Sequence, residues 1–306
     1  MLRMVEPPPV GTFIDIQGRQ LWYLRAGASA PAVVVVPGAG SFGLDFFLVH
    51  ERVSVQATSL LYDRAGTGWS DDVSLPRSTD EVTDELRELL QMLDVPSPYL
   101  MVGHSLGGAY IQRYAQRFPG EVAGLLLLDP LHEDWDEYQP NHLKLAASVP
   151  SEDAQLPDLP PQVIDQLRVM LRETLAGFPE PVREAVVARH VSADRIPTGF
   201  REGLNALAIL DDLRGGALRP DVPVTILSAT GIDAQQLMFA TEDRLREQIQ
   251  GSERLYDAIA ATLPQGEHLT VTDASHTTLP MARPAMVSDA VFRLIARVAE
   301  MGRITK

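Results

Sequence analysis

The chain has 306 residues and no cysteine, and its 41 acidic and 26 basic side chains give a formal net charge of −15. Without cysteine, disulfides, thiolate metal sites and a cysteine nucleophile are excluded. The acidic balance argues against nucleic-acid binding, which needs a basic face. No apolar run is long enough to cross a bilayer. The first nine residues lack the apolar core of a signal peptide, so we expect a cytoplasmic protein with no membrane partner.

Predicted strands and helices alternate along most of the chain. The patterns predict, in order, a hairpin (12–16 and 19–24), strands at 32–36 and 59–62, a helix at 79–93, a strand at 99–102, a helix at 106–118, strands at 122–128, 224–228 and 268–272, and a final helix from Pro284 to about residue 301. The continuous valine run at 33–36 is typical of a strand buried on both faces. This alternation indicates an α/β protein with a mostly parallel central sheet and helices on both faces.

The alternation is interrupted between Pro130 and about Val222. This segment is rich in proline and contains amphipathic helical patterns, such as the one from Val163 to Leu171. Because core strands are predicted on both sides, we interpret residues 130–222 as a helical insertion. The core would then consist of residues 1–129 and 223–306. A second independent domain is the alternative interpretation.

One motif carries most of the chemical information. Gly103-His104-Ser105-Leu106-Gly107 lies between a predicted strand and a predicted helix, which is the context of a nucleophile elbow. The two glycines avoid side-chain clashes in a very tight turn. Ser105 would adopt a strained backbone conformation, with its hydroxyl above the end of the sheet.

This motif is preceded by two further segments and followed by a histidine near the C-terminus. The order of these features along the chain resembles that of the α/β-hydrolase fold superfamily. The segments are Pro37-Gly38-Ala39-Gly40 and Asp63-Arg64-Ala65-Gly66-Thr67-Gly68-Trp69-Ser70, and the histidine is His276. The chain looks most like the capped esterase, lactonase and peptidase members. The resemblance implies the α/β-hydrolase fold, with residues 130–222 as a helical cap.

The resemblance also implies a catalytic triad in the chain order serine, acid, histidine. Ser105 would be the nucleophile and His276, just after the last predicted strand, the base. Asp233 follows the first strand after the insertion, where the family usually carries its acid. Asp129, at the end of the strand before the insertion, is the alternative, because some members use an acid there.

Backbone amides are expected to form the oxyanion hole. The Leu106 amide, at the start of the elbow helix, is one expected donor. Ala39 is the other, supported by Gly38 and Gly40 in a loop where many relatives have His-Gly. The segment 63–70 is expected to be a structural turn in which Arg64 forms an internal ion pair.

The remaining histidines suggest no catalytic role. His104 would pack beside the serine, and both His104 and His132 are candidates for the substrate pocket. We expect the other histidines to be surface or cap residues, namely His50, His142, His190 and His268. They show no metal-ligand spacing, so neither a metal nor a cofactor is expected.

These observations favour a serine hydrolase acting on a small or medium acyl substrate: an ester, a lactone or a thioester. Relatives that cleave epoxides or carbon–halogen bonds use aspartate at the elbow, whereas Ser105 indicates an acyl-enzyme route. An amidase, a carbon–carbon bond hydrolase and a perhydrolase share this chemistry. The alternative from another class is a non-catalytic ligand-binding protein on the same fold.

Overall fold

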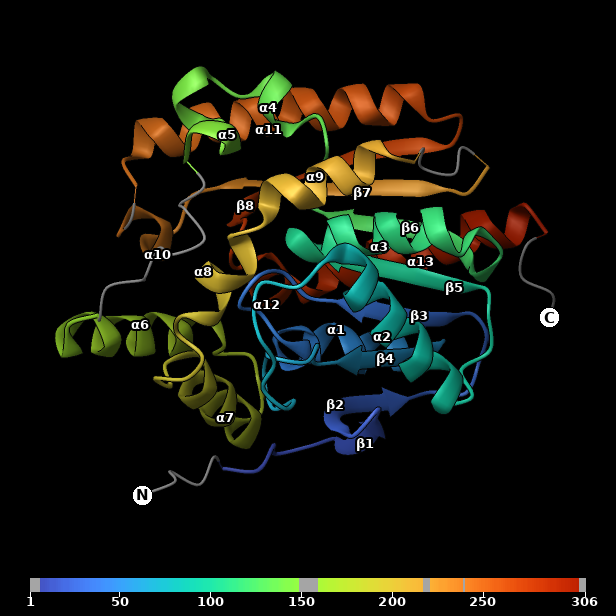
Figure 1. The fold of residues 1–306 in the computed structure, drawn as a ribbon, viewed down its shortest axis with the longest axis horizontal. Coiled ribbons are helices and arrows are strands. Elements are labelled where there is room, and N and C mark those ends of the chain that lie inside the picture. The colour runs from blue at the N-terminus through green and yellow to red at the C-terminus, as the bar shows by residue number, and fades with distance from the viewer. Residues whose placement is uncertain (1–5, 149–158, 217–220, 239, 303–306) are drawn as a thin grey trace.

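The computed structural model describes residues 6–148, 159–216, 221–238 and 240–302. Within these residues, eight strands form one sheet in the order β1-β2-β4-β3-β5-β6-β7-β8 (Figure 1). The strands are β1 (Thr12–Ile16), β2 (Arg19–Ala26), β3 (Ala32–Val36), β4 (Thr58–Tyr62), β5 (Tyr99–His104), β6 (Val122–Leu128), β7 (Val224–Gly231) and β8 (Gly266–Ser275). Only β1–β2 and β2–β4 pair antiparallel. The predicted mostly parallel sheet with an antiparallel edge is therefore confirmed.

Helices cover both faces of this sheet (Figure 1). Outside the segment between β6 and β7, the helical elements are η1 (Gly43–Phe46), α1 (Phe47–Ser54), α2 (Thr79–Met92), α3 (Leu106–Arg117), η2 (Pro119–Glu121), α10 (Ala234–Leu237), α11 (Glu242–Thr262), α12 (Leu279–Ala282) and α13 (Pro284–Glu300). Apolar residues of α1 and α13 pack on one face of the sheet, and those of α2, α3 and α11 pack on the other. Two separate layers of core result.

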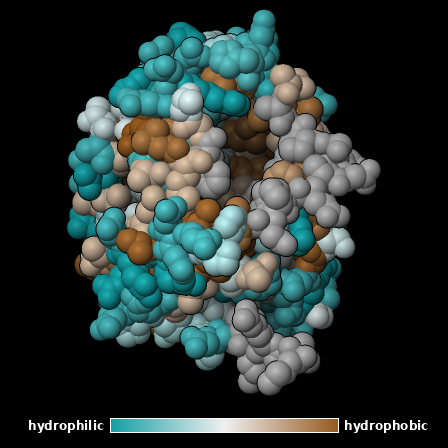
Figure 2. Space-filling view, turned by 90° about the vertical axis from the view of Figure 1, so that its left-hand side faces the viewer, coloured by the Kyte–Doolittle hydropathy of each residue, from teal (hydrophilic) through white to brown (hydrophobic). Residues whose placement is uncertain are grey.

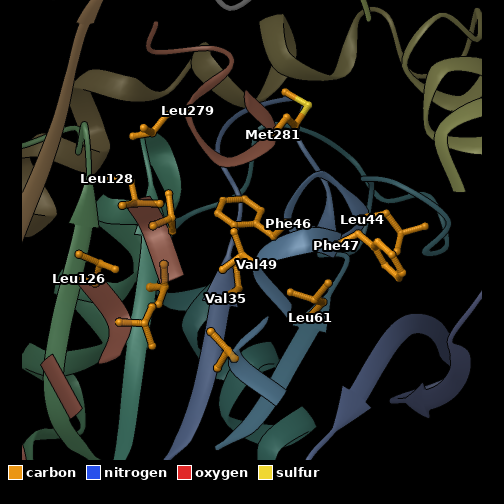
Figure 3. Close-up of a cluster of buried hydrophobic side chains, with 14 of the residues drawn as sticks. Val35, Leu44, Phe46, Phe47, Val49, Leu61, Leu126, Leu128, Leu279 and Met281 are labelled. Atoms are coloured by element: carbon orange, nitrogen blue, oxygen red, sulfur yellow. The ribbon is translucent and has the colours of Figure 1, made fainter. Parts of the chain in front are cut away.

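The sequence of β3 explains why the sheet is buried on both faces. Successive side chains of a strand point to opposite faces. Val33 and Val35 accordingly belong to one core cluster, and Val34 and Val36 to the other. On the first face, side chains of β3, β4 and β6 meet those of η1 and α1, with Phe46 in the middle of the group (Figure 3).

The segment between β6 and β7 is helical. Its elements are α4 (Trp135–Tyr138), η3 (Asn141–Leu143), α5 (Leu145–Ser148), α6 (Pro161–Thr174), α7 (Glu180–His190), α8 (Thr198–Gly203) and α9 (Ala206–Arg214). Helices α6, α7 and α8 gather at one side of the molecule, at the left in Figure 1. Helix α9 lies beside α3, and its Ile209 and Leu213 are part of the core. The inserted helices are thus anchored directly on the core.

Two core helices, α1 and α11, were not predicted from the sequence. Helix α11 has 21 residues, but its N-terminal half is mostly polar and contains Gly251, which has a low helix propensity. His50 in α1 was expected on the surface or in the cap, which is wrong. It is 1% exposed, and its Nδ1 lies 2.9 Å from the Ser59 hydroxyl oxygen.

Among the described residues, no helix combines the length and the apolar character that a membrane span requires.

Candidate active site

The predicted site residues follow the carboxyl ends of the parallel strands. Because these ends share one edge of the sheet, residues far apart in the chain meet there. Ser105 follows β5, Asp129 follows β6 and His276 follows β8. A cavity of about 390 Å³ opens at this edge, and both Ser105 and His276 line it. Figure 2 shows this side of the molecule, where a hollow has hydrophobic residues at its bottom.

Ser105 has the backbone conformation of a strained turn, with φ 51° and ψ −119°. Its N–H donates to the Leu128 carbonyl at 2.9 Å, and its carbonyl accepts from the amides of Gly108 and Leu131 at 2.9 and 3.0 Å. These bonds hold a φ that non-glycine residues rarely adopt. A Cβ atom on Gly107 would lie 2.0 Å from the Val36 carbonyl oxygen. The second glycine of the elbow is therefore required sterically.

His276 lies beside Asp129. The His276 Nδ1 is 3.6 Å from the Asp129 Oδ2, which is an ion-pair distance but too long for a hydrogen bond. The imidazole is 41% exposed and lines the cavity, while the Asp129 side chain is only 7% exposed. The amide of Ala229 donates to the same Oδ2 at 3.1 Å. This carboxylate is thus fixed by the backbone of β7 and oriented toward the ring.

Asp233, the acid that the sequence favoured, has other partners. One carboxylate oxygen accepts from the Gln236 amide at 2.8 Å and caps α10. The other accepts from the Thr277 hydroxyl at 2.6 Å and from the Ser275 hydroxyl. Asp233 therefore binds the residues on both sides of His276. The geometry favours the alternative, Asp129, as the partner of the imidazole.

The loop after β3 and the elbow residues His104 and Ser105 line the cavity. Gly38, Ala39 and Gly40 all line it. However, the Gly40 amide donates to Glu202 Oε2 at 2.8 Å, so it is not available to an oxyanion. The Leu106 amide lies in the first turn of α3, where amides have no intrahelical acceptor.

The two pocket histidines differ in position. His104 lines the cavity, and its Nε2 donates to the His276 carbonyl at 2.9 Å. Burial lowers the pKa of His104 to about 3, so the ring stays neutral beside His276. His132 does not line this cavity. It is buried, with its Nε2 3.4 Å from Glu133 Oε2 and its Nδ1 3.7 Å from Asp134 Oδ2.

The cavity wall is mainly apolar, but Ser41, Arg195, Gln235 and Thr277 also line it, together with the pair of His190 and Asp45. The apolar side chains include Leu159, Leu167, Leu171, Val191, Ile196, Phe200 and Met281. His190 Nε2 lies 2.7 Å from Asp45 Oδ1, and the Asp45 residue is 1% exposed. His190 was expected on the surface or in the cap and lies at the end of α7, whereas no role was predicted for Asp45. The sequence offers no signal for the pair, because 145 positions separate the two residues. Within the described residues, no cluster of histidine, aspartate or glutamate suits a metal ion.

Comparison with known proteins identifies the family. A model of the alpha/beta hydrolase family matches residues 33–290. The chain belongs to the α/β hydrolase family. An esterase from Thermogutta terrifontis superposes on this hydrolase-family chain with a TM-score of 0.62 at 22% identity, covering 94% of this chain and 97% of the esterase. A putative epoxide hydrolase from Pseudomonas aeruginosa gives a TM-score of 0.66 at 18% identity, covering 95% and 96%. Identities this low show the fold alone.

Sequence relatives match only in part. The human (lyso)-N-acylphosphatidylethanolamine lipase is 31% identical over 104 residues, which cover 33% of this chain and 30% of the lipase. The match covers 37% of an uncharacterized Bacillus subtilis protein and 15% of a Schizosaccharomyces pombe protein. The chain therefore matches less than half the length of these curated relatives.

Proposed function

We propose that the protein is a serine hydrolase that cleaves a carboxylic ester, lactone or thioester with a small or medium acyl group. The observation that carries the proposal is the strained Ser105 sharing one cavity with His276, whose other side faces the buried Asp129. A nucleophile, a base and an acid in this relation form a Ser-His-Asp triad. Asp129 takes the acid role here, in place of Asp233.

The proposed reaction follows from these positions. His276 Nδ1 faces Asp129, which leaves Nε2 to accept the proton of the Ser105 hydroxyl. The Ser105 oxygen attacks the acyl carbon, and the Leu106 and Ala39 amides donate to the resulting oxyanion. His276 then returns the proton to the leaving alcohol or thiol. In the second half, His276 takes a proton from water, and the water oxygen attacks the acyl carbon. His276 then gives this proton to the Ser105 oxygen as the bond between that oxygen and the acyl carbon breaks and the acid leaves.

The cavity supports the proposed substrate class. Its volume of about 390 Å³ is within the range of small-molecule sites. The apolar wall formed by Leu167, Leu171, Ile196, Phe200 and Met281 suits an acyl chain. The names of two similar proteins, an esterase and a lipase, point to the same bond type. We prefer acyl transfer to epoxide opening because the elbow residue is a serine.

Substitution of the nucleophile tests this function. Ser105→Ala is expected to lower kcat for p-nitrophenyl butyrate by at least about 10³-fold, because the acyl-enzyme cannot form. Circular dichroism and thermal unfolding should match the wild-type protein. Turnover by Ser105→Ala close to that of the wild-type protein would refute the proposal. Failure of a fluorophosphonate probe to label Ser105 in folded wild-type protein would favour a non-catalytic binding protein.

A further inference from the structure

A buried ion pair joins the inserted helices to the core directly behind the cavity. Arg64, in the turn after β4, is 1% exposed, and Glu202 belongs to α8. The Arg64 Nη2 and Nε lie 2.8 and 3.1 Å from Glu202 Oε1. Burial by itself lowers the pKa of Arg64, but the Glu202 carboxylate raises it above the usual value. The guanidinium is therefore charged, and Glu202 compensates it.

Both members of the pair also bind the loop after β3. Arg64 Nη1 donates to the Pro37 carbonyl at 2.6 Å, and Nη2 donates to the Gly38 carbonyl at 2.9 Å. Glu202 Oε2 accepts from the Gly40 amide at 2.8 Å. The loop is thus held at three successive peptide units. Neither Arg64 nor Glu202 binds the Ala39 amide, which lies between the Gly38 carbonyl and the Gly40 amide.

These bonds set the direction in which the Ala39 amide points. In a trans peptide, the carbonyl and the N–H lie in one plane and point in opposite directions. The Gly38 carbonyl and the Ala39 N–H belong to the same peptide unit. Because Arg64 binds that carbonyl, it restrains the orientation of this peptide unit, and the Ala39 N–H points away from the guanidinium. A charged donor at the carbonyl also polarises the unit, which strengthens its N–H as a donor.

Helix α8 touches the same loop through its backbone. A Cβ atom on Gly40, whose φ is +69°, would lie 2.9 Å from the Gly199 Cα. A Cβ atom on Gly199 would lie 3.3 Å from the Ala39 carbonyl oxygen. A side chain at Gly40 would therefore be strained, and one at Gly199 would press on the loop. Helix α8 therefore contacts this loop both through Gly199 and through Glu202.

We propose that Arg64 and Glu202 are positioning residues for the oxyanion hole, and that Glu202 couples its geometry to the placement of α8. The inference rests on the proposed acyl-transfer function. With α8 packed on the loop after β3, the Ala39 amide points to the oxyanion that forms when Ser105 attacks the acyl carbon. If α8 moves away, the Gly40 amide and Arg64 lose the Glu202 carboxylate as their acceptor. The oxyanion hole then loses its geometry.

A charge-removing variant tests the pair. Glu202→Gln keeps the size of the side chain but removes the charge that compensates Arg64. We expect kcat for p-nitrophenyl butyrate to fall roughly 10- to 100-fold, less than the loss of a whole oxyanion donor, with KM changed less than about threefold. The control is Asp194→Asn. Asp194 pairs with Arg189 at 2.8 Å, and Arg189 donates to the Gly68 carbonyl, away from residues 37–40. This control should retain kcat within about twofold to threefold.

A second pair of variants tests the same idea without leaving a buried charge. Gly199→Ala places a methyl group 3.3 Å from the Ala39 carbonyl oxygen, whereas at Gly203 in the same helix nothing lies within 4 Å of the added Cβ. We expect Gly199→Ala to lower kcat with little change in KM, and Gly203→Ala to resemble the wild-type protein. Equal kcat values for the two variants would contradict the proposed coupling.

Hydrogen exchange gives a readout that does not depend on turnover. Amides of residues 38–41 should exchange faster in Glu202→Gln than in the wild-type protein and in Asp194→Asn. Unchanged exchange together with unchanged kcat would overturn the inference while leaving the hydrolase function intact. If instead the wild-type protein neither cleaves esters nor reacts with the probe, the proposed function fails. The exchange data then decide the coupling on their own.

Discussion

The two candidate acids differ enough in their surroundings to be separated by one pair of substitutions. Asp129→Asn keeps the shape of the side chain but removes the charge 3.6 Å from His276 Nδ1. At an effective dielectric constant of about 20, a carboxylate and an imidazolium at that separation attract by about 4.6 kcal/mol. Solvent at the partly exposed ring weakens this attraction. We therefore expect kcat to fall about 10²- to 10³-fold, or about 2.7–4.1 kcal/mol.

Asp233→Asn should have a much smaller effect. The asparagine oxygen still accepts one hydrogen bond, so either the cap on Gln236 or a bond to the hydroxyls beside His276 survives. A loss of kcat below about tenfold is expected, because only the placement of the histidine loop is loosened. The assay is the initial rate of p-nitrophenyl butyrate hydrolysis at saturation. Thermal unfolding of both variants serves as the folding control. A larger loss for Asp233→Asn than for Asp129→Asn would refute the assignment of Asp129.

Two further predictions concern stability. Gly107→Ala should lower the free energy of unfolding by more than about 4 kcal/mol, because the new Cβ would lie 2.0 Å from the Val36 carbonyl oxygen. At Gly120 nothing lies within 4 Å of an added Cβ, so Gly120→Ala should stay within about 0.5 kcal/mol of the wild-type protein in urea unfolding. Equal stabilities of the two variants would contradict this steric account. Burial lowers the pKa of His50 from its ordinary 6.5 to about 4 in the folded protein. Between pH 6.5 and pH 4, His50 therefore binds more protons in the unfolded chain than in the folded one, and the free energy of unfolding falls as the pH falls. From pH 7 to 5 the contribution of His50 is a loss of about 2 kcal/mol. His50→Asn should reduce the wild-type loss by that amount, and an identical pH dependence of the two proteins would rule the effect out.

Much of the fold could be predicted because its signals are local. The valine run of β3, the alternation of elements and the glycines around Ser105 each reflect a requirement within a few residues of the chain. Helix α11 was missed for the opposite reason. Its core contacts include Leu255, Tyr256 and Ile259 in its C-terminal half, whereas its N-terminal half is mostly polar.

The ranking of the two acids illustrates a signal that the sequence contained. Asp129 and Asp233 follow neighbouring strands, so strand order alone places both at the same edge. But Asp233 is followed three residues later by Gln236, which is a capping-box pattern, and in the structure both halves of the box are formed. A capping carboxylate has one oxygen committed to the backbone. Asp129 begins no helix, and its positive φ of 41° turns it out of the strand direction.

The partner of Arg64 could not have been identified in the same way. A buried guanidinium requires a compensating charge, so the sequence could indicate that an acid exists among its 41. Glu202 lies 138 positions away, in a helix of six residues that has no periodicity of its own. Only the packing of α8 against Gly40 makes it the partner. Substitutions that displace α8 without touching the substrate should therefore lower kcat for p-nitrophenyl butyrate.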